Sequence, residues 1–505
     1  MDALLPSLPL SPDACYAVLQ ARDSRFDGKM YVGVTSTGIY CRPICRVRAP
    51  KRENCVFFAH AAQAEAAAFR PCLKCRPELA PGGALRWSVM DASKTLAQQA
   101  AAWLDGQTQA EASVEDLATH LGITSRHLRR IFAAEHGVTP LQYLQTRRLL
   151  LAKHLLTDTA LPVTQVALQA GFASLRRFNA AFVEHYRLQP TALRREGKAK
   201  TTGLPSALLL AYRPPYHVDA MLEFLERRAI VGIETIDKAR RSIRRSLRIT
   251  QAGQGCEGWL EVTFDANRPQ VRLSLSEGLV PATATVLPLV RRWLDLDADP
   301  LQIDAALATL PAHACQQPGV RLPGCVDRFE LAVRAVLGQQ VTVAAARTLA
   351  SRFVQRFGTP LNEAAPEGLT RVFPEPEQIA AASRDDIASL GIIARRADAL
   401  RLLAEAWPRL LINQAQATHE AAQQELIALP GLGPWTASYM LMRMWSWPDA
   451  FLPGDVVLRK QLATPGEPLP SPKRVLELSQ AWQPYRSYAV MRLWRATTPP
   501  PTELS

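Results

Sequence analysis

The sequence predicts a multidomain protein that is mostly α-helical, with smaller α+β parts. At 505 residues the chain is too long for one hydrophobic core, so we expect three or four domains. A cysteine-rich N-terminal segment is followed by alternating helical patterns, then by strand-like runs, and finally by helical patterns to the end. These changes of pattern predict domains at residues 1–85, 99–197, 204–288 and 289–505.

The charge balance favours an acidic partner. The formal net charge of +13 is typical of proteins that bind nucleic acid. A membrane surface would also attract such a chain, but no run approaches the roughly 18 apolar residues of a membrane span. The stretch from Met1 to Pro12 has no basic start and is broken by prolines, so we do not expect a signal peptide. Nine cysteines, four of them in a metal pattern, suit a reducing cytoplasm better than a disulfide scaffold.

Two cysteine pairs near the N-terminus have the spacing of zinc ligands. Cys41-Arg-Pro-Ile-Cys45 and Cys72-Leu-Lys-Cys75 can each bring two thiolates to one tetrahedral metal. On spacing alone, a structural zinc is the plainest interpretation. The same window is strongly basic, which indicates contact with phosphate, and its cationic residues are Arg42, Arg46, Arg48, Lys51, Arg52, Arg70, Lys74 and Arg76.

The flanks of these cysteines carry a resemblance. Thr35-Ser-Thr-Gly-Ile-Tyr precedes Cys41 and Phe69-Arg-Pro precedes Cys72, and with them residues 11–80 resemble the N-terminal domain of the Ada family of adaptive-response proteins. The resemblance implies that Cys41 is a zinc thiolate that irreversibly accepts a methyl group from a methylated DNA phosphate. It implies Cys45, Cys72 and Cys75 as the other zinc ligands. It also implies DNA-backbone contacts at the matching positions, which are Thr37, Arg46, Arg48 and Arg70.

Residues 99–197 contain two copies of one helical pattern. Gly122 and Gly171 each follow a short helix and precede a Ser N-cap and a second helix. The second helices have apolar residues that we expect to face inward: Leu128, Ile131 and Phe132 in the first copy, Phe178 and Phe182 in the second. Their outward side chains suit the major groove of DNA: Arg126, His127, Arg129 and Arg130 in the first copy, Arg176, Arg177 and Asn179 in the second.

One such copy would fit a plain helical bundle with solvated charges. Two copies, joined by Gly137-Val-Thr-Pro140 and a further helix, resemble the AraC-type transcription activator domain. The resemblance implies two recognition helices in successive turns of the major groove, and RNA polymerase as a partner at a promoter. Ada-type proteins carry this domain directly after the zinc domain, so the order of the two blocks supports both resemblances.

The remaining chain predicts an α+β domain followed by helices. A linker at Lys198 to Gly203 precedes strand-like runs at Ser206–Tyr212, Gly258–Phe264 and Gln270–Ser274, with a helix at Val218–Arg228. From Trp293 onward the pattern is helical.

Two motifs near the C-terminus bear on chemistry. Pro-Gly431-Leu-Gly433 predicts a hairpin between two helices, whose free backbone N–H groups can bind a DNA phosphate. Turns of this kind are common, but here Phe451-Leu-Pro-Gly-Asp455 follows. By itself Asp455 could be an ordinary helix N-cap, and the two roles are compatible because a cap fixes the carboxylate.

This pair of motifs resembles the helix-hairpin-helix DNA glycosylases. Tyr-Arg-Pro-Pro-Tyr216 and Leu322-Pro-Gly-Cys-Val-Asp327 extend the resemblance to the AlkA branch over residues 204–497. It implies hydrolytic excision of alkylated bases, such as 3-methyladenine and 7-methylguanine, from double-stranded DNA. It implies the following site: Asp455 as the catalytic carboxylate, Trp435, Tyr439 and Trp494 as the base pocket, and Gln340, Gly431 and Gly433 as DNA contacts.

Absences and departures refine this expectation. Trp435 stands where strand-cleaving relatives carry a Schiff-base lysine, so we expect base release without strand cleavage. The last cysteine is Cys325, so no iron–sulfur cluster can follow the hairpin, and the sequence Pro-Cys-His-Arg of a second methyl acceptor is absent. Gln340 replaces the leucine wedge of some relatives, and Val456 replaces an aromatic residue.

The sequence therefore predicts a cytoplasmic, bacterial-type fusion of a methyl-sensing activator with a DNA glycosylase. Two other hypotheses remain open. The chain could be a transcription regulator whose glycosylase half only binds DNA, or a zinc-stabilised DNA-binding module in which Cys41 is inert.

Overall fold

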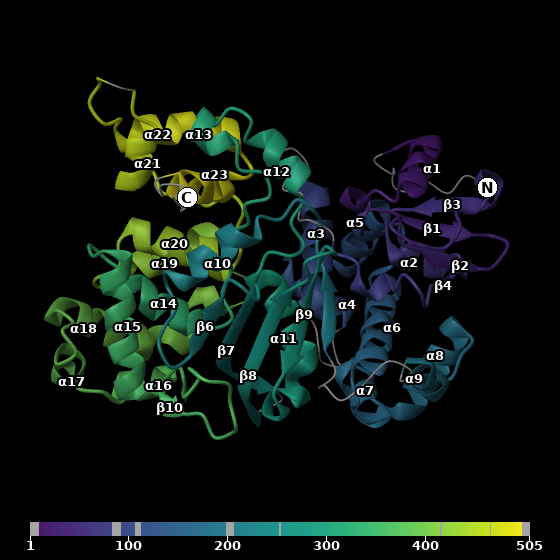
Figure 1. The fold of residues 1–505 in the computed structure, drawn as a ribbon, viewed down its shortest axis with the longest axis horizontal. Coiled ribbons are helices and arrows are strands. Elements are labelled where there is room, and N and C mark those ends of the chain that lie inside the picture. Colours follow the sequence, from purple (N-terminus) through teal and green to yellow (C-terminus); the bar gives the residue numbers. More distant parts are fainter. Residues whose placement is uncertain are drawn as a thin grey trace.

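The computed structural model describes residues 10–82, 92–106, 113–197, 207–251, 254–414, 417–464 and 466–496. Figure 1 shows the small N-terminal sheet and the helices after it on one side of the molecule, a larger sheet in the middle, and the C-terminal helices on the other side. The predicted fold class, a multidomain chain that is mostly helical with α+β parts, is confirmed.

The N-terminal part is a four-stranded sheet with the strand order β3-β1-β2-β4. Its strands pair so that Val32 lies opposite Cys41 and Tyr40 lies opposite Pro71, which brings Cys41 and the residue after Pro71 to neighbouring strand ends. Helices cover the sheet. The elements are α1 (Pro12–Ala21), β1 (Tyr31–Val34), β2 (Ile39–Cys41), β3 (Cys55–Phe58), α2 (Ala61–Ala66) and β4 (Arg70–Pro71), with single 3₁₀ turns at Ser24–Phe26, Arg52–Asn54 and Pro77–Leu79.

The next block consists of helices in two related units. The elements are α3 (Ala92–Gly106), α4 (Val114–His120), α5 (Ser125–His136), α6 (Pro140–Asp158), α7 (Val163–Gln169), α8 (Leu175–Tyr186) and α9 (Pro190–Gly197). Gly122 and Gly171 both adopt positive φ, as a tight turn between two helices requires. The predicted inward residues of α5 and α8 are all buried, which confirms their helical face.

One predicted cap is wrong by one residue. Helix α8 begins after Ser174, whose side chain accepts a hydrogen bond from the N–H of Arg177 at 3.2 Å. In α5 the cap is Thr124 and not Ser125, because Thr124 Oγ1 accepts from the N–H of His127. Thr and Ser both cap well, so the sequence leaves the choice between neighbours undecided.

The central sheet has five antiparallel strands in the order β5-β9-β8-β7-β6. Its elements are β5 (Leu208–Ala211), α10 (Val218–Glu226), β6 (Glu234–Asp237), β7 (Ser242–Gln251), β8 (Gln254–Phe264) and β9 (Gln270–Leu275). The sequence predicted β5, β8, β9 and α10 but missed β6 and β7. Arginines hide the alternation in β7, where Ile243, Leu247 and Ile249 nevertheless face the core with Arg245.

The C-terminal part is helical from α11 onward, which begins before the predicted Trp293. Its helices are α11 (Thr283–Trp293), α12 (Pro300–Ala306), α13 (Ala312–Cys315), α14 (Arg328–Leu337), α15 (Val343–Phe357), α16 (Pro376–Ala381), α17 (Arg384–Ala388), α18 (Ala394–Ala406), α19 (His419–Ala428), α20 (Pro434–Met444), α21 (Val456–Gln461), α22 (Pro472–Ser479) and α23 (Arg486–Arg495). A two-stranded sheet, β10 (Thr359–Pro360) with β11 (Arg371–Val372), lies among them. Among the described residues, no helix has both the length and the apolar character that crossing a membrane requires.

The blocks pack against one another through buried contacts. One apolar core runs without a break from the second helical unit, through Phe178 and Phe182, into the central sheet. The predicted linker at Lys198–Gly203 lies outside the described residues. Between the N-terminal sheet and α6, Glu65 Oε2 accepts from Thr146 Oγ1 at 3.0 Å, and Arg76 pairs with Asp158 at 2.7 Å. Burial raises the pKa of Glu65 to about 8 against the lowering effect of its hydrogen bonds.

Four charged residues, of which Arg245 and Glu330 are buried, join the central sheet to the C-terminal helices. Arg245 pairs with Glu234 at 2.7 Å and Glu330 at 2.6 Å, and Arg334 pairs with the same two carboxylates at 2.7 and 2.6 Å. Each carboxylate thus has two guanidinium partners. Removing one arginine leaves the buried carboxylate of Glu330 and the half-buried one of Glu234 with half their compensation.

We predict that Arg245→Ala destabilises the C-terminal half by about 3–5 kcal/mol, the usual cost of breaking a buried ion pair. Urea unfolding, monitored at the transition of this half, measures the effect. The matched control is Arg240→Ala, which removes an exposed ion pair to Asp237 on the neighbouring hairpin and should cost less than about 1 kcal/mol. Equal effects of the two substitutions would contradict the importance of the buried network.

Candidate functional site

The four predicted zinc ligands come together. Their Sγ atoms all lie within 4.8 Å of one another, although the two pairs come from different strands. A tetrahedral zinc with Zn–S bonds of about 2.3 Å separates its sulfurs by a little under 4 Å, so the donor set fits zinc. Cys45 and Cys72 are buried, whereas Cys41 and Cys75 are half-buried. Two thiols are therefore better shielded from solvent than the other two.

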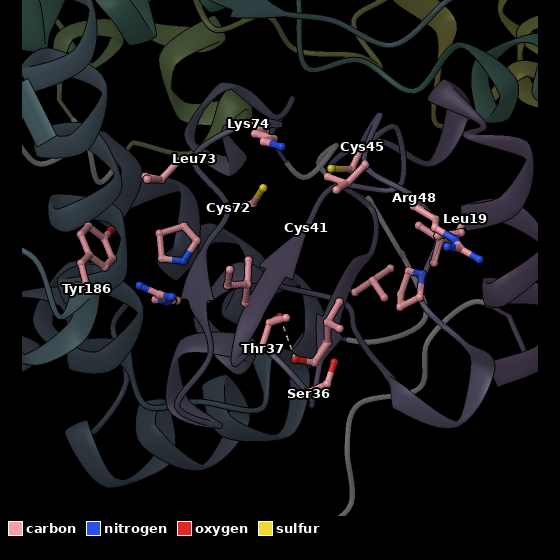
Figure 2. Close-up of a pocket in the computed structure, with 18 of the residues that line it drawn as sticks. Leu19, Ser36, Thr37, Cys41, Cys45, Arg48, Cys72, Leu73, Lys74 and Tyr186 are labelled. Carbon is pink, nitrogen blue, oxygen red and sulfur yellow. Dashed lines mark hydrogen bonds between the residues drawn. The ribbon is translucent and has the colours of Figure 1, made fainter. Parts of the chain in front are cut away.

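Cys41 borders a cavity of about 540 Å³ (Figure 2). Predicted DNA contacts Thr37, Arg48 and Arg70 line it, while Arg46 is exposed close to Cys45 but is not part of the lining. Figure 2 also shows Tyr186 entering from a helix opposite the cysteines. The far wall belongs to the second helical unit and contains Phe182, Tyr186, Leu188 and Leu193. A half-buried thiol thus borders a cavity large enough for part of a DNA backbone.

One member of the predicted basic cluster is not available to phosphate. Arg42 is buried, and its guanidinium pairs with the carboxylate of Asp27. Its backbone N–H donates to Cys75 Sγ at 3.3 Å, and its Nη1 donates to the Cys75 carbonyl at 3.1 Å. Arg42 therefore supports the cysteine cluster from inside, and the positive charge toward solvent comes from its neighbours.

The predicted recognition residues lie on the outer faces of α5 and α8. Arg126, Arg129, Arg130, Arg176 and Arg177 are exposed, and His127 and Asn179 are half-buried. Two of them have weak partners on the protein: Arg129 with Glu115 at 3.1 Å, and Arg130 with His127 Nδ1 at 3.2 Å. An exposed ion pair such as Arg129–Glu115 contributes little stability, so Arg129 can give up Glu115 for a phosphate at small cost.

Asp455 lies at the end of a short loop and has ordered donors on both oxygens. Oδ1 accepts the N–H groups of Val457 at 2.9 Å and Leu458 at 3.0 Å, which makes Asp455 the N-cap of α21. Oδ2 accepts from Trp435 Nε1 at 2.9 Å, and Trp494 Nε1 reaches Oδ1 at 3.3 Å. Only 9% of Asp455 is exposed. The capping role and the site role therefore coexist in one carboxylate.

The predicted aromatic residues surround this carboxylate. The Trp435 and Tyr439 rings are stacked at 5.3 Å with an interplanar angle of 8°, and Trp494 lies 6.2 Å from Tyr439.

The hairpin between α19 and α20 precedes Trp435 in the sequence. Gly431 has φ +89° there, and a Cβ on it would fall 2.7 Å from Ala399 Cβ, so a larger residue is excluded. Gln340 is exposed, with φ +53°, on the loop before α15.

Sequence reasoning missed three residues of this site. Arg443 Nη1 donates to the Tyr439 hydroxyl at 2.8 Å, and its spacing of four residues on one helix was the signal. Arg228 stacks on Phe224 at 3.8 Å, and both line a cavity of about 70 Å³ next to Trp494. Burial raises the pKa of Tyr439, but Arg443 and Arg228 outweigh it and leave the pKa below its usual value.

Four known families match successive parts of the chain. They are the metal binding domain of Ada at residues 14–78, a helix-turn-helix domain at 117–196, the AlkA N-terminal domain at 207–327, and the HhH-GPD superfamily of base excision DNA repair proteins at 333–482. The fold and the sites thus define a class: a zinc-binding, helix-turn-helix protein fused to a base-excision repair fold.

A relative of nearly the same length identifies the family. The probable bifunctional transcriptional activator/DNA repair enzyme AlkA of Mycobacterium tuberculosis is 36% identical over 493 residues, which cover 95% of this chain and 96% of the relative. The chain belongs to this family of bifunctional activator and DNA repair proteins.

Two shorter matches correspond to the two halves. DNA-3-methyladenine glycosylase 2 of Escherichia coli is 37% identical over 286 residues, covering 56% of this chain and 95% of that enzyme. The bifunctional transcriptional activator/DNA repair enzyme Ada of the same organism is 36% identical over 165 residues, covering 32% of this chain and 43% of Ada. The match to Ada therefore omits more than half of that relative.

We predict one tightly bound zinc per chain. Cys45→Ser should lose most of this zinc, because a hydroxyl is a poor zinc ligand at neutral pH. Cys55→Ser is the matched control, since its buried thiol lies in the same domain but donates to the Lys51 carbonyl. Metal analysis of the purified proteins measures the zinc content of each variant. Zinc loss from the Cys55 variant, or full zinc retention in the Cys45 variant, would contradict the assigned ligands.

Proposed function

We propose that this chain excises alkylated bases from double-stranded DNA and also carries a methylphosphotriester acceptor that turns on promoter binding. The observation that carries the first activity is Asp455, a nearly buried carboxylate fixed by two backbone N–H groups and two indoles, with the Tyr439 ring packed against those indoles. The cysteine cluster beside a basic surface supports the second. A reducing cytoplasm, where thiols stay free, suits both.

Excision would begin with extrusion of the damaged nucleotide, because the sugar cannot be reached inside the duplex. Alkylation at N3 or N7 makes the base cationic, and the aromatic rings attract it by cation–π interaction worth about 0.5–2 kcal/mol for each ring. The glycosidic C1′–N bond then breaks, and its electron pair leaves with the base, which becomes neutral. No strong acid is needed for this departure.

Asp455 would act on the sugar. Its carboxylate stabilises the oxocarbenium-like cation and orients the water whose oxygen forms the new bond to C1′; the carboxylate or solvent takes the released proton. The indole and backbone donors hold the carboxylate in place before the reaction, so little reorganisation is required. Since Trp435 occupies the position of a Schiff-base lysine, the product would be an abasic site in an intact strand.

We predict that Asp455→Asn lowers release of 3-methyladenine by at least about a hundredfold, because an amide lacks the charge that stabilises the sugar cation. Release of the free base from methylated duplex DNA measures this. Asp327→Asn is the matched control: Asp327 also caps a helix, α14, and Asn caps equally well, so this variant should remain near wild-type activity. Near-normal release by the Asp455 variant would show that another group is the catalytic carboxylate.

Methyl transfer would take place at Cys41. Zinc, when bound, keeps the thiol deprotonated at neutral pH and so makes it nucleophilic. Cys41 Sγ attacks the methyl carbon of a phosphotriester lying in the cavity, the carbon–oxygen bond breaks, and its electron pair returns to the phosphate as an ordinary diester. Thr37, Arg48 and Arg70 line the same cavity and would hold the flanking DNA backbone. The resulting thioether is neutral, and thus the transfer cannot repeat.

Promoter binding would follow from charge. The cysteine cluster loses one negative charge on methylation while the exposed arginines remain, so its attraction for DNA increases. The recognition helices α5 and α8 would then read the promoter, and recruitment of RNA polymerase would complete activation.

We predict a single added methyl group, located on Cys41, after incubation with methylphosphotriester DNA. Mass spectrometry locates it, and promoter binding measured at two salt concentrations should show higher affinity that falls with added salt. Cys41→Ser should take up no methyl group, because a hydroxyl is a poor nucleophile at neutral pH. A methyl group on Cys45, Cys72 or Cys75, or methylation without a change in affinity, would contradict the sensor assignment.

A further inference from the structure

One connection between the cysteine cluster and the glycosylase half runs through the buried residue Asp27. Only 1% of Asp27 is exposed, and it is contacted on two sides. Its carboxylate accepts from Arg42 Nε at 2.8 Å and also from Arg42 Nη2. Its backbone carbonyl accepts from Arg213 Nε at 2.9 Å. Arg42 belongs to the cysteine cluster and Arg213 to the glycosylase half, so Asp27 links the two.

On the cluster side, Arg42 has little freedom. It follows Cys41 directly, its N–H donates to Cys75 Sγ, and its guanidinium donates to the Cys75 carbonyl. The position of its side chain therefore depends on the position of Cys75. A metal that fixes four sulfurs fixes Cys75, whereas without a metal Cys75 would be tied to the neighbouring strand only by its hydrogen bonds with Arg42.

On the glycosylase side, Arg213 is completely buried, and its guanidinium donates to backbone carbonyls. It donates to the carbonyls of Pro81 at 3.3 Å and Gly82 in the N-terminal part, and to those of Asp297 at 2.6 Å and Ala298 at 3.4 Å in its own half. If the halves separated, several buried N–H groups would lose their acceptors, which costs about 1–3 kcal/mol for each group. Burial lowers the pKa of Arg213, as expected for a desolvated cation.

Further contacts lie at the same interface, where residues 27–29 and 81–82 meet Arg213 and residues 297–299; we call this interface the joint. These contacts require the two segments to approach closely. Lys29 pairs with the buried Asp299 at 2.5 Å, and the N–H of Gly82 donates to Asp297 Oδ1. Gly28 has φ +73°, and a Cβ on it would fall 2.0 Å from the Pro81 carbonyl oxygen, so the loop next to Asp27 leaves no room for a side chain. The surface formed by Asp27, Lys29 and Gly82 is thus shaped to fit Arg213, Asp297 and Asp299.

We propose that metal loading of the cysteine cluster controls the docking of the N-terminal domain on the glycosylase half. Zinc fixes Cys75, Cys75 positions Arg42, and Arg42 holds Asp27 so that its carbonyl meets Arg213. Loss of zinc releases Asp27 and opens the joint, while the helix-hairpin-helix part keeps its own fold. This coupling requires zinc at the cluster but neither methyl transfer nor base excision, so it can fail or succeed independently of both activities.

Hydrogen–deuterium exchange on the full chain tests the proposal. Zinc-loaded protein is compared with protein depleted by a chelator, with metal analysis of each sample. Depletion should speed exchange at residues 207–216 and 295–299 by about tenfold or more, with residues 429–445 unchanged. Unchanged exchange at residues 207–216 and 295–299 in protein shown to be free of zinc would overturn the proposal, as would equal loss of protection at 429–445.

A variant tests the link itself. Asp27→Asn keeps the size of the side chain but removes the charge that binds Arg42. At saturating zinc, the backbone amides of the joint should therefore exchange faster than in the wild-type chain. Asp23→Asn is the matched control, because Asp23 lies in the same loop and pairs with Arg25 within its own domain. If the backbone amides of the joint exchange at the same rate in the Asp27 variant and in the control, the proposed link through Asp27 is wrong.

Thermodynamic reciprocity gives an independent readout. If zinc stabilises the joint, an intact joint must strengthen zinc binding by the same factor. The guanidinium of Arg213 donates to carbonyls and not to the cysteines, so Arg213→Met should weaken zinc affinity in a competition titration with a chelator by the factor found in the exchange experiment. Wild-type zinc affinity in this variant, despite an open joint, would contradict the coupling.

Discussion

Arg213 has no exposed surface, and its guanidinium donates hydrogen bonds to carbonyls of both halves of the chain. A buried cation is stable only where its N–H groups all find acceptors, so this one contact requires the N-terminal loop and the loop after α11 to stay in register. Other buried arginines have the same role elsewhere. Arg42 supports the cysteines, Arg245 joins the central sheet to the C-terminal helices, and Arg443 holds Tyr439. The positions of both candidate sites therefore depend on buried guanidinium groups.

The two proposed reactions share a physical strategy. In each, a group of ordinary reactivity is fixed in an environment that favours one charge state: a thiol by a metal, and a carboxylate by indole and backbone donors. Neither needs a strong acid or base, because the substrates are already activated by alkylation. Both products have lost charge, since a cationic base leaves neutral and a thiolate becomes a thioether.

Much of this could be predicted from the sequence, because motifs report local chemistry. Four cysteines at ligand spacing, two glycine turns followed by capped helices, and a glycine hairpin before Asp455 are each visible without a structure. That the residues within each of these motifs come together in space is implied by the family resemblances. The sequence could also predict the inward faces of α5 and α8, since apolar residues recur at helical spacing.

The remainder depends on long-range contacts that no local pattern reports. Strand β7 was not predicted because Arg245 occupies an inward position, where its partner Glu330 comes from a distant segment. Arg42 looked like a phosphate contact because the sequence gives its charge but not its burial against Asp27. Arg213 stood within a recognisable motif, yet its role depends on carbonyls of Pro81 and Gly82 more than a hundred residues away. Interdomain joints of this kind become visible only in three dimensions.

The proposed function depends most on whether the C-terminal half breaks the glycosidic bond or only binds DNA. The most direct measurement is the incubation of the zinc-loaded wild-type chain with double-stranded DNA containing 3-methyladenine, with separate quantification of free base and of strand breaks. We expect catalytic release of the base, leaving abasic sites in unbroken strands. Tight binding of the damaged duplex without any released base would show that this half acts only as a DNA-binding part of a regulator, and would contradict the account.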